Sequence, residues 1–383
     1  MNGFDIQSPR WLARAGLAGP GGVCRRGLAA LGMAGAILAA AGIAEGASPS
    51  AAGAAGTVYT ADERGNSISA IDIGTGRVEI LRIRIAPHNV QVTADGAYLL
   101  AVGDPVADDH GHGHGAAKDG DAKGRLLVFD TASLARGPLA DIAVGAHPAH
   151  VVADRDGRRA FVTNAADNSV SVIDLAGRTV ISTVGTGRYP HGLRMSPDGR
   201  EVYVANVEDG SLTVIDTARL AEVARIPVGA APVQVGFVPD GSRVYVSLRD
   251  ENRVAVVDTT SRKVTRRIDV GRNPIQVHAV PDGRQVYVAN QGTDADPADT
   301  VSVIDTASGT VVDTIRTGKG AHGVAVDETG AVVFITNIAD ATVSAIDTAT
   351  RTVTATFGVG RGPNGITYRG SLKADDRKKG GSQ

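Results

Sequence analysis

The sequence predicts an all-β fold in which seven four-stranded blades close into a ring, and three observations support this prediction. Runs related to Tyr-Val-Ala-Asn recur at residues 202–206, 244–247 and 286–290, a step of 42 residues. Asp-Gly pairs keep the same step at 156–157, 198–199, 240–241 and 282–283. Each of four strand types can be counted seven times along the chain, as in a β-propeller.

Each repeat is expected to contain four short strands. The first follows a Pro or His, as at 191–195, and the second carries the Tyr-Val-Ala-Asn-like run. The third ends in Ile-Asp, as at 213–216, and the fourth is rich in Val, as at 223–228. The Asp-Gly pairs predict two-residue hairpins of type I′, because Gly tolerates the positive φ that this turn requires.

Two further features concern the turns of the blades and the closure of the ring. The aspartates that close the third strands are expected to bind turn amides, which is a structural role: Asp72, Asp130, Asp174, Asp216, Asp258, Asp305 and Asp347. The repeats open with a second-type strand at 58–61 and close with a first-type strand at 365–368. The last strand should therefore complete the first blade and leave no free sheet edge.

Composition limits the partners that the chain can have. Hydrophobic residues make up 43% and charged residues 21%, typical of a globular protein, and the net charge is −2. This charge provides no bulk attraction to double-stranded nucleic acid or anionic membranes, and we expect a monomer. The predicted organisation is an export signal and linker at 1–56, the propeller at 57–370 and a disordered polar tail at 371–383.

The first residues are typical of an export signal. Arginines precede an uncharged stretch at 27–43, and small residues follow. Arg25 and Arg26 resemble a twin-arginine signal, with the general export route as the alternative. Cleavage would leave a mature chain without a membrane span, in the periplasm or outside the cell. Cys24 is the single cysteine and would leave with the signal. Any metal must then be held by His, carboxylate or amide groups.

The repeat resembles that of the YVTN-family propellers. The resemblance rests on the Tyr-Val-Ala-Asn runs, Phe161-Val162-Thr163-Asn164, Ser-Val-Ile-Asp and Pro-Asp-Gly, and it extends over residues 58–370. It implies the seven-bladed fold. It says little about function, because this family includes surface, redox-associated and binding proteins.

Histidines gather at one position of the repeat. Alignment on the hairpin turns places seven first-strand residues at one ring position, namely His88, Ala149, His191, Val233, Ile275, His322 and Asn364. His150 is adjacent to this position, so the polar members come from five consecutive blades. At a channel mouth these side chains could bind a divalent metal or an anion. The alternative is that each His binds the backbone of a neighbouring blade.

An insertion between Gly103 and Gly124 falls in a loop on the same face. It holds an acidic and histidine-rich segment made of Asp108, Asp109, His110, His112 and His114. Alternating His and Gly allow imidazoles to wrap zinc, copper or nickel, although such a tract can also be a solvated linker. Together with the ring histidines it predicts a divalent transition metal, and we expect zinc.

Two other features are expected on this face. A lengthened loop at 294–299 adds carboxylates, which are best explained as a polar loop. A collar of basic residues precedes four first strands and could bind an anion or a partner: Arg188, Arg272, Lys319 and Arg361.

These residues favour a non-enzymatic metal binder or metallochaperone. The layout resembles periplasmic propeller-type zinc chaperones, which implies a metal-transport binding protein or another exported protein as partner. The alternative is a scaffold that binds protein, glycan or single-stranded nucleic acid through the collar. A lactonase-like or metal-assisted hydrolase is less favoured because no nucleophile motif is present. Covalent haem is excluded by the lack of Cys-x-x-Cys-His, whereas non-covalent haem stays open.

Overall fold

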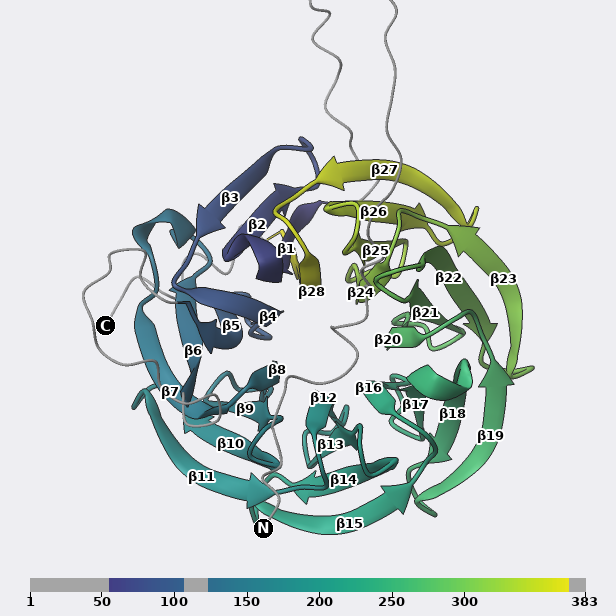
Figure 1. The fold of residues 1–383 in the computed structure, drawn as a ribbon, viewed down its shortest axis with the longest axis horizontal. Coiled ribbons are helices and arrows are strands. Elements are labelled where there is room, and N and C mark those ends of the chain that lie inside the picture. Colours follow the sequence, from purple (N-terminus) through teal and green to yellow (C-terminus); the bar gives the residue numbers. More distant parts are fainter. Residues whose placement is uncertain (1–54, 107–122, 372–383) are drawn as a thin grey trace, which may run out of the picture. The chain divides into compact units, whose positions relative to one another are not determined.

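The computed structural model describes residues 55–106 and 123–371. These residues form seven antiparallel four-stranded sheets, which stand as blades around a central axis (Figure 1). The predicted seven-bladed propeller is confirmed. From the channel outward, blade 1 consists of β28 (Pro363–Gly370), β1 (Gly56–Asp62), β2 (Ser67–Asp72) and β3 (Val78–Arg82).

The other six blades use consecutive strands. Blade 2 contains β4 (Ile85–Val92), β5 (Tyr98–Pro105), β6 (Lys123–Asp130) and β7 (Ala140–Ala146), and blade 3 contains β8 (Pro148–Ala153), β9 (Arg159–Asn164), β10 (Ser169–Asp174) and β11 (Thr179–Gly185). Blade 4 contains β12 (Pro190–Met195), β13 (Glu201–Asn206), β14 (Ser211–Asp216) and β15 (Ala221–Pro227). Blade 5 contains β16 (Pro232–Phe237), β17 (Arg243–Leu248), β18 (Arg253–Asp258) and β19 (Lys263–Asp269). Blade 6 contains β20 (Pro274–Ala279), β21 (Gln285–Gly292), β22 (Pro297–Asp305) and β23 (Thr310–Arg316). Blade 7 contains β24 (Ala321–Val326), β25 (Val332–Asn337), β26 (Thr342–Asp347) and β27 (Thr352–Gly358).

Helical structure within the described ranges is limited to three short 3-10 turns. They are η1 (Glu63–Gly65), η2 (Leu134–Arg136) and η3 (Arg249–Glu251). None of the described helices could cross a membrane, because each is far too short.

The ring closes as the sequence predicts. Strand β28 pairs antiparallel with β1, and Val58 lies opposite Tyr368 in this ladder. The innermost strand of blade 1 therefore comes from the end of the repeat region and its other three strands from the beginning. This pairing satisfies the backbone of an edge that would otherwise be free to bind another chain.

The core lies between neighbouring blades and is supplied by the repeats. The tyrosines of the Tyr-Val-Ala-Asn-like runs, Tyr203, Tyr245 and Tyr287, are all buried. Tyr203 packs in one cluster with Val235 and Val244 of the next blade. Each blade therefore covers its neighbour.

The closing aspartates of the third strands have the structural role that was predicted. Asp216, for example, accepts hydrogen bonds from the backbone N–H groups of Ala218 and Arg219 at 2.9 and 2.7 Å. The other six accept equivalent bonds, from Thr75, Ala132, Ala176, Ser261, Ser308 and Thr350.

The Asp-Gly turns are not two-residue hairpins, and that prediction was wrong. A type I′ turn needs positive φ at both central residues, whereas Gly199 has φ +78° and Asp198 does not have positive φ. The N–H of Gly199 donates to the carbonyl of Ser196 at 2.8 Å, so Pro197 and Asp198 are the central residues of a longer turn. The carboxylate of Asp198 stabilises this turn by accepting from the Ser196 hydroxyl at 2.6 Å.

Candidate metal site at the channel mouth

The predicted ring position coincides with an irregularity that repeats in the seven inner strands. In each of them the pairing with the second strand shifts register just after the strand begins. In β4 the residue without a partner is His88, between Pro87 and Asn89. In β12 the shift lies between Pro190 and Leu193 and includes His191. Such bulges re-aim side chains, which explains why these residues leave the regular pattern of the sheet.

Three of the predicted histidines come together. Each of His88, His150 and His191 offers a ring nitrogen, and these nitrogens all lie within 4.8 Å of one another. The Nε2 atoms of His88 and His191 are 3.1 Å apart, and the ring centroids of His150 and His191 are 4.9 Å apart. The three imidazoles belong to β4, β8 and β12, so three consecutive blades contribute one each.

Glu63 orients His88. The Oε1 atom of Glu63 lies 3.1 Å from Nδ1 of His88, and Nδ2 of Asn364 donates to Oε2 of Glu63 at 2.7 Å. Burial raises the pKa of Glu63, but the charge of His88 and the hydrogen bonds from His88 and Asn364 outweigh this effect and lower the pKa to about 2. An ionised carboxylate accepts, so the proton of His88 is held on Nδ1 and Nε2 is directed at His191.

His191 is held in the same manner by a backbone carbonyl. Its Nδ1 atom lies 3.3 Å from the carbonyl oxygen of Val233 and must donate to it. In the neutral rings, the two Nε2 atoms that face each other across 3.1 Å would then both present lone pairs. Two lone pairs at this distance repel unless a cation, either a proton or a metal ion, lies between or beside them.

His150 is held differently from the other two. It is 1% exposed, and Nε2 of Gln234 donates to its Nδ1 at 3.3 Å. The Oε1 atom of Gln234 is occupied by the backbone N–H of Val235 at 2.9 Å, so the amide is fixed in this orientation. Burial first, and then the charges of His191 and His88, lower the pKa of His150 well below its usual value. To act as a ligand, His150 has to give up the Gln234 bond, either by binding the metal through Nδ1 or by moving its proton from Nε2 to Nδ1.

His322 and Asn364 lie beside the cluster. His322 is 7% exposed, and neither ring nitrogen has a hydrogen-bond partner among the described residues. Burial first, and then the charge of His88, lower its pKa to about 3, so the ring is neutral. Asn364 contacts the cluster through Glu63, and its Nδ2 atom is 3.2 Å from Nδ1 of His88. Asn364 therefore contacts the cluster from its edge, through Glu63 and His88.

The histidine-rich insertion falls between β5 and β6, as predicted, but Asp108, Asp109, His110, His112 and His114 lie outside the described residues. Beside the insertion, Oδ2 of Asp104 accepts from Nδ1 of His147 at 2.8 Å. The lengthened loop of blade 6 holds carboxylates that are paired with arginines. Asp296 pairs with Arg272 at 2.6 Å and Asp299 with Arg316 at 2.9 Å, consistent with the polar-loop interpretation.

Three of the four collar residues are engaged locally. Arg188 forms an ion pair with Asp209 at 2.6 Å, and Arg272 is neutralised by Asp296. Arg361 donates to the carbonyl oxygen of Arg64 at 3.2 Å. Lys319 has no ion pair within residues 55–106 and 123–371. Most residues of the basic collar therefore form separate local contacts, and they do not make a continuous positive surface.

Sequence reasoning missed Glu63 and Gln234, although a signal for Glu63 exists. Glu63 occupies the repeat position that follows the second strand, where other blades carry Ala165, Val207 or Ile338. Asp104 occupies the same position in blade 2. Each of these two carboxylates contacts a histidine. A carboxylate at this repeat position was therefore the sequence feature that could have predicted the contact between Glu63 and His88.

Comparisons with known proteins agree with this architecture. A family described as YNCE-like beta-propeller matches residues 138–244. The chain is a seven-bladed β-propeller repeat protein. No curated protein matches the sequence.

Solved structures share the fold of this propeller. Kuenenia stuttgartiensis hydrazine synthase is 22% identical with a TM-score of 0.62, over 73% of this chain and 89% of that chain. A functionally unknown protein from Desulfotomaculum acetoxidans DSM 771 is 16% identical with a TM-score of 0.67, over 82% of this chain and 99% of that chain. At these identities the similarity concerns the fold alone.

Proposed function

We propose that this propeller is an exported, non-enzymatic protein that binds a divalent transition metal, zinc first, through His88, His150 and His191. The observation that carries the proposal is the pair of Nε2 atoms of His88 and His191, which face each other at 3.1 Å while both Nδ1 atoms are held by acceptors. A metal ion would remove the repulsion between these lone pairs.

The donor set fits zinc. A tetrahedral site with Zn–N bonds of about 2.0–2.1 Å separates its ligand nitrogens by about 3.3–3.4 Å, close to the 3.1 Å between His88 and His191. Zinc ligands typically donate their second ring N–H to a carboxylate or a carbonyl, and Glu63 and Val233 supply these two acceptors here. His150 would provide the third nitrogen.

Three imidazoles leave one tetrahedral position open, which suits metal transfer. A ligand from another protein could occupy that position and then replace the histidines one by one. The histidine-rich insertion begins close to the cluster along the chain and is proposed to capture the ion first. We infer a metal-transport binding protein as the recipient, in the periplasm or outside the cell, to which the export signal expected at 1–56 would direct this chain.

A hydrolase would need the same open position to activate water, and no second group in the cluster is placed as a nucleophile. The scaffold alternative relies on the collar, whose Arg188 and Arg272 are already paired with carboxylates. Both alternatives therefore rank below metal binding.

Competitive titration of the metal-free protein with Zn²⁺ tests the proposal. We expect one tight site that His88→Gln/His191→Gln abolishes, while His278→Gln, which changes a partly buried histidine outside the cluster, keeps it. Deletion of residues 108–114 should slow uptake or remove weaker sites and leave the tight site intact. A wild-type protein that binds no zinc above background would overturn the proposal.

A further inference from the structure

The turns between first and second strands lie at the opposite end of the inner strands from the histidine cluster. Each inner strand has the histidine position near its start and this turn after its end. Three consecutive blades carry Pro-Asp-Gly in the turn, with the prolines Pro197, Pro239 and Pro281. Each proline packs on the glycine of the following blade's turn; a Cβ atom at Gly241, for example, would lie 3.5 Å from Cδ of Pro197. Proline therefore fills the space between two neighbouring turns.

Two adjacent blades depart from this motif. Blade 2 has Ala94 at the proline position, and no atom of another turn lies within 4 Å of a Cβ placed at Gly157 of the following turn. Blade 3 has Arg155, whose Cδ lies 3.7 Å from the Cβ position of Gly199, so the stem of the arginine replaces the proline ring. The first change leaves a space open, and the second places a guanidinium beside it.

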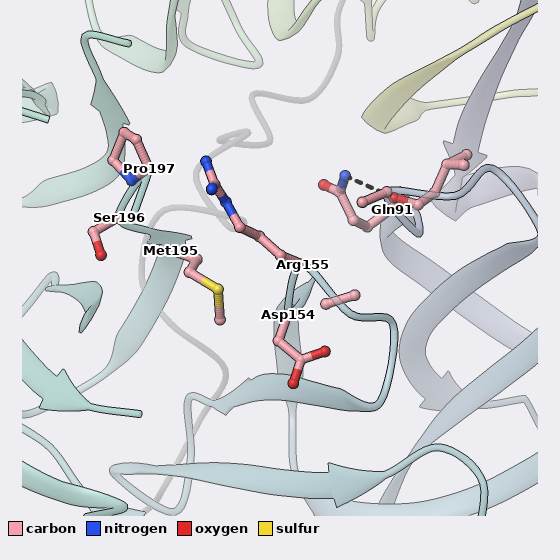
Figure 2. Close-up of a pocket in the computed structure, with 9 residues that line it drawn as sticks. Gln91, Asp154, Arg155, Met195, Ser196 and Pro197 are labelled. Atoms are coloured by element: carbon pink, nitrogen blue, oxygen red, sulfur yellow. Dashed lines mark hydrogen bonds between the residues drawn. The ribbon is translucent and has the colours of Figure 1, made fainter. Parts of the chain in front are cut away.

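A cavity of about 220 Å³ lies at this place, between blades 2, 3 and 4. Figure 2 shows Arg155 extending into it from the β8–β9 turn. The cavity has room for a small organic molecule, since an apolar cavity of about 150 Å³ holds benzene. Its apolar lining is formed by Val92, Ala94, Ala153, Met195 and Pro197.

Arg155 is an unpaired charge in this lining. Its guanidinium has no ion pair and no hydrogen bond within residues 55–106 and 123–371. Among the described lining residues the carboxylate is that of Asp154, which is 8% exposed and already accepts from Nε of Arg159 at 3.0 Å and from the N–H of Arg158 at 2.8 Å. The five N–H donors of Arg155 therefore face the cavity without an acceptor.

Gln91 offers a further donor from blade 2. Its Nε2 atom donates one hydrogen to the carbonyl oxygen of Val92 at 3.1 Å, which fixes the amide beside the cavity (Figure 2). The second hydrogen of this NH₂ group has no partner in the described part of the chain. Ser196 adds no donor, because its hydroxyl donates to Asp198 at 2.6 Å. Free donors therefore outnumber free side-chain acceptors in the lining.

We propose that this cavity binds a small monocarboxylate with an apolar body. The carboxylate pairs with the guanidinium of Arg155, whose planar fork suits two parallel hydrogen bonds, and the apolar body covers Met195 and Ala153. A bare oxyanion would meet the charge and leave the apolar lining exposed to water. The inference does not depend on the metal site, because it uses other residues, at the other end of the inner strands, and a ligand of opposite charge.

Met195 allows binding to be observed directly. The chain has three methionines, and Met1 and Met33 precede the described residues, so isotope labelling of methionine methyl groups places one reporter in the propeller, at the cavity. In NMR titrations of the metal-free protein, sodium hexanoate should shift the Met195 signal saturably. Sodium acetate and 1-hexanol each lack one half of the ligand and should bind at least about tenfold more weakly. No shift with hexanoate, or acetate that binds as tightly, would overturn the site.

Substitutions in one turn test the role of the charge. Arg155→Met should weaken hexanoate binding at least about tenfold, and Arg155→Lys should lose less because it keeps the charge without the fork. Arg158→Met is the matched control, because it removes the same charge from an exposed residue of the same turn that does not line the cavity. It should bind hexanoate as the wild type does. Equal binding in Arg155→Met and wild type would refute the assignment.

Ala94→Pro restores the motif proline and should fill the cavity. The N–H of Gly96 donates to the carbonyl oxygen of Thr93 at 2.8 Å, so Ala94 is the first central residue of the turn, where proline is favoured. We expect this variant to be at least as heat-stable as the wild type and to bind hexanoate severalfold more weakly. His88→Gln/His191→Gln should bind hexanoate normally, which separates this site from the metal site. Unchanged hexanoate binding in folded Ala94→Pro would contradict the proposal.

Discussion

The Nε2 atoms of His88 and His191 lie 3.1 Å apart although the two residues are 103 positions apart in the chain. The propeller brings them together because both sit at the bulge of an inner strand, in blades 2 and 4. His150 of the blade between them completes the set, with its ring centroid 5.8 Å from that of His88. The contact results from the repeat geometry, whereas the imidazoles themselves are departures from the repeat sequence.

Glu63 should act on metal affinity as a positioning residue. Glu63→Gln removes the carboxylate that holds the Nδ1 proton of His88, so we expect zinc affinity to fall about 10- to 100-fold. Competitive zinc titration measures this change. Glu79→Gln is the matched control, because Glu79 lies on the outer strand of the same blade and pairs with Arg77. Equal zinc affinity in Glu63→Gln and wild type would contradict the assignment.

The asparagine of the repeat should contribute stability within each blade. Asn206 is fully buried, and its Nδ2 atom donates to the hydroxyls of Ser211 and Thr213, both at 3.0 Å. Asn206→Ala leaves these hydroxyls without that donor, so we expect a loss of about 1–3 kcal/mol in the free energy of unfolding. Urea unfolding gives the value. Ser211→Ala removes one of the two bonds and should cost less; the reverse order would refute this explanation.

His278 should make the fold sensitive to acid. Burial, with the charge of Arg194 acting in the same direction, lowers its pKa from 6.5 to about 4. Between these pH values the unfolded chain takes up a proton that the folded chain does not, so stability falls as the pH falls through this range. In His278→Gln the loss of unfolding free energy between pH 7 and pH 4.5 should be smaller, by up to ~2 kcal/mol.

His147 provides a comparison of opposite sign. Its hydrogen bond to Asp104 raises its pKa, so His147 adds stability at low pH that disappears as the pH rises through the folded pKa. His147→Gln should therefore enlarge the acid-induced loss. Urea unfolding of both variants at the two pH values measures the effects. An unchanged acid response in His278→Gln would show that another group controls it.

The closing strand should be indispensable for folding. A chain that ends at residue 362 lacks β28, which leaves β1 without its inner partner and exposes Val58 and Ile71 of the core. We expect this truncation to be insoluble or unfolded by circular dichroism and size-exclusion chromatography. A chain that ends at residue 371 keeps the complete ladder and should melt as the full chain does. Soluble, cooperatively melting protein from the shorter truncation would contradict the closure.

The sequence predicts the fold well because the repeat encodes each strand seven times. The period, the phase of β1 and β28, and the structural role of Asp216 and its equivalents all follow from patterns that recur. The turn type was mistaken because the hydrogen bond from Ser196 to Asp198 and the central Pro197 favour a longer turn than Asp-Gly alone suggests.

The site was predicted in part. Alignment identified His88, His150 and His191, because they interrupt a hydrophobic or small-residue position. Alignment also suggested His322 as a metal ligand and did not separate it from these three histidines, although its ring nitrogens have no hydrogen-bond partner among the described residues. Alignment could not assign which nitrogen carries a proton, since Glu63 and Val233 determine this through contacts between blades. For the same reason the unpaired state of Arg155 becomes visible only when the turns of neighbouring blades are placed.

The central claim is that three imidazoles of the channel mouth bind one metal ion, and X-ray absorption at the zinc edge tests it most directly. The protein loaded with one equivalent of Zn²⁺ should show three imidazole nitrogens at about 2.0–2.1 Å together with one exchangeable oxygen ligand such as water. In His88→Gln/His191→Gln that signature should disappear. A spectrum dominated by oxygen ligands, or one that is identical in the double variant, would contradict the account.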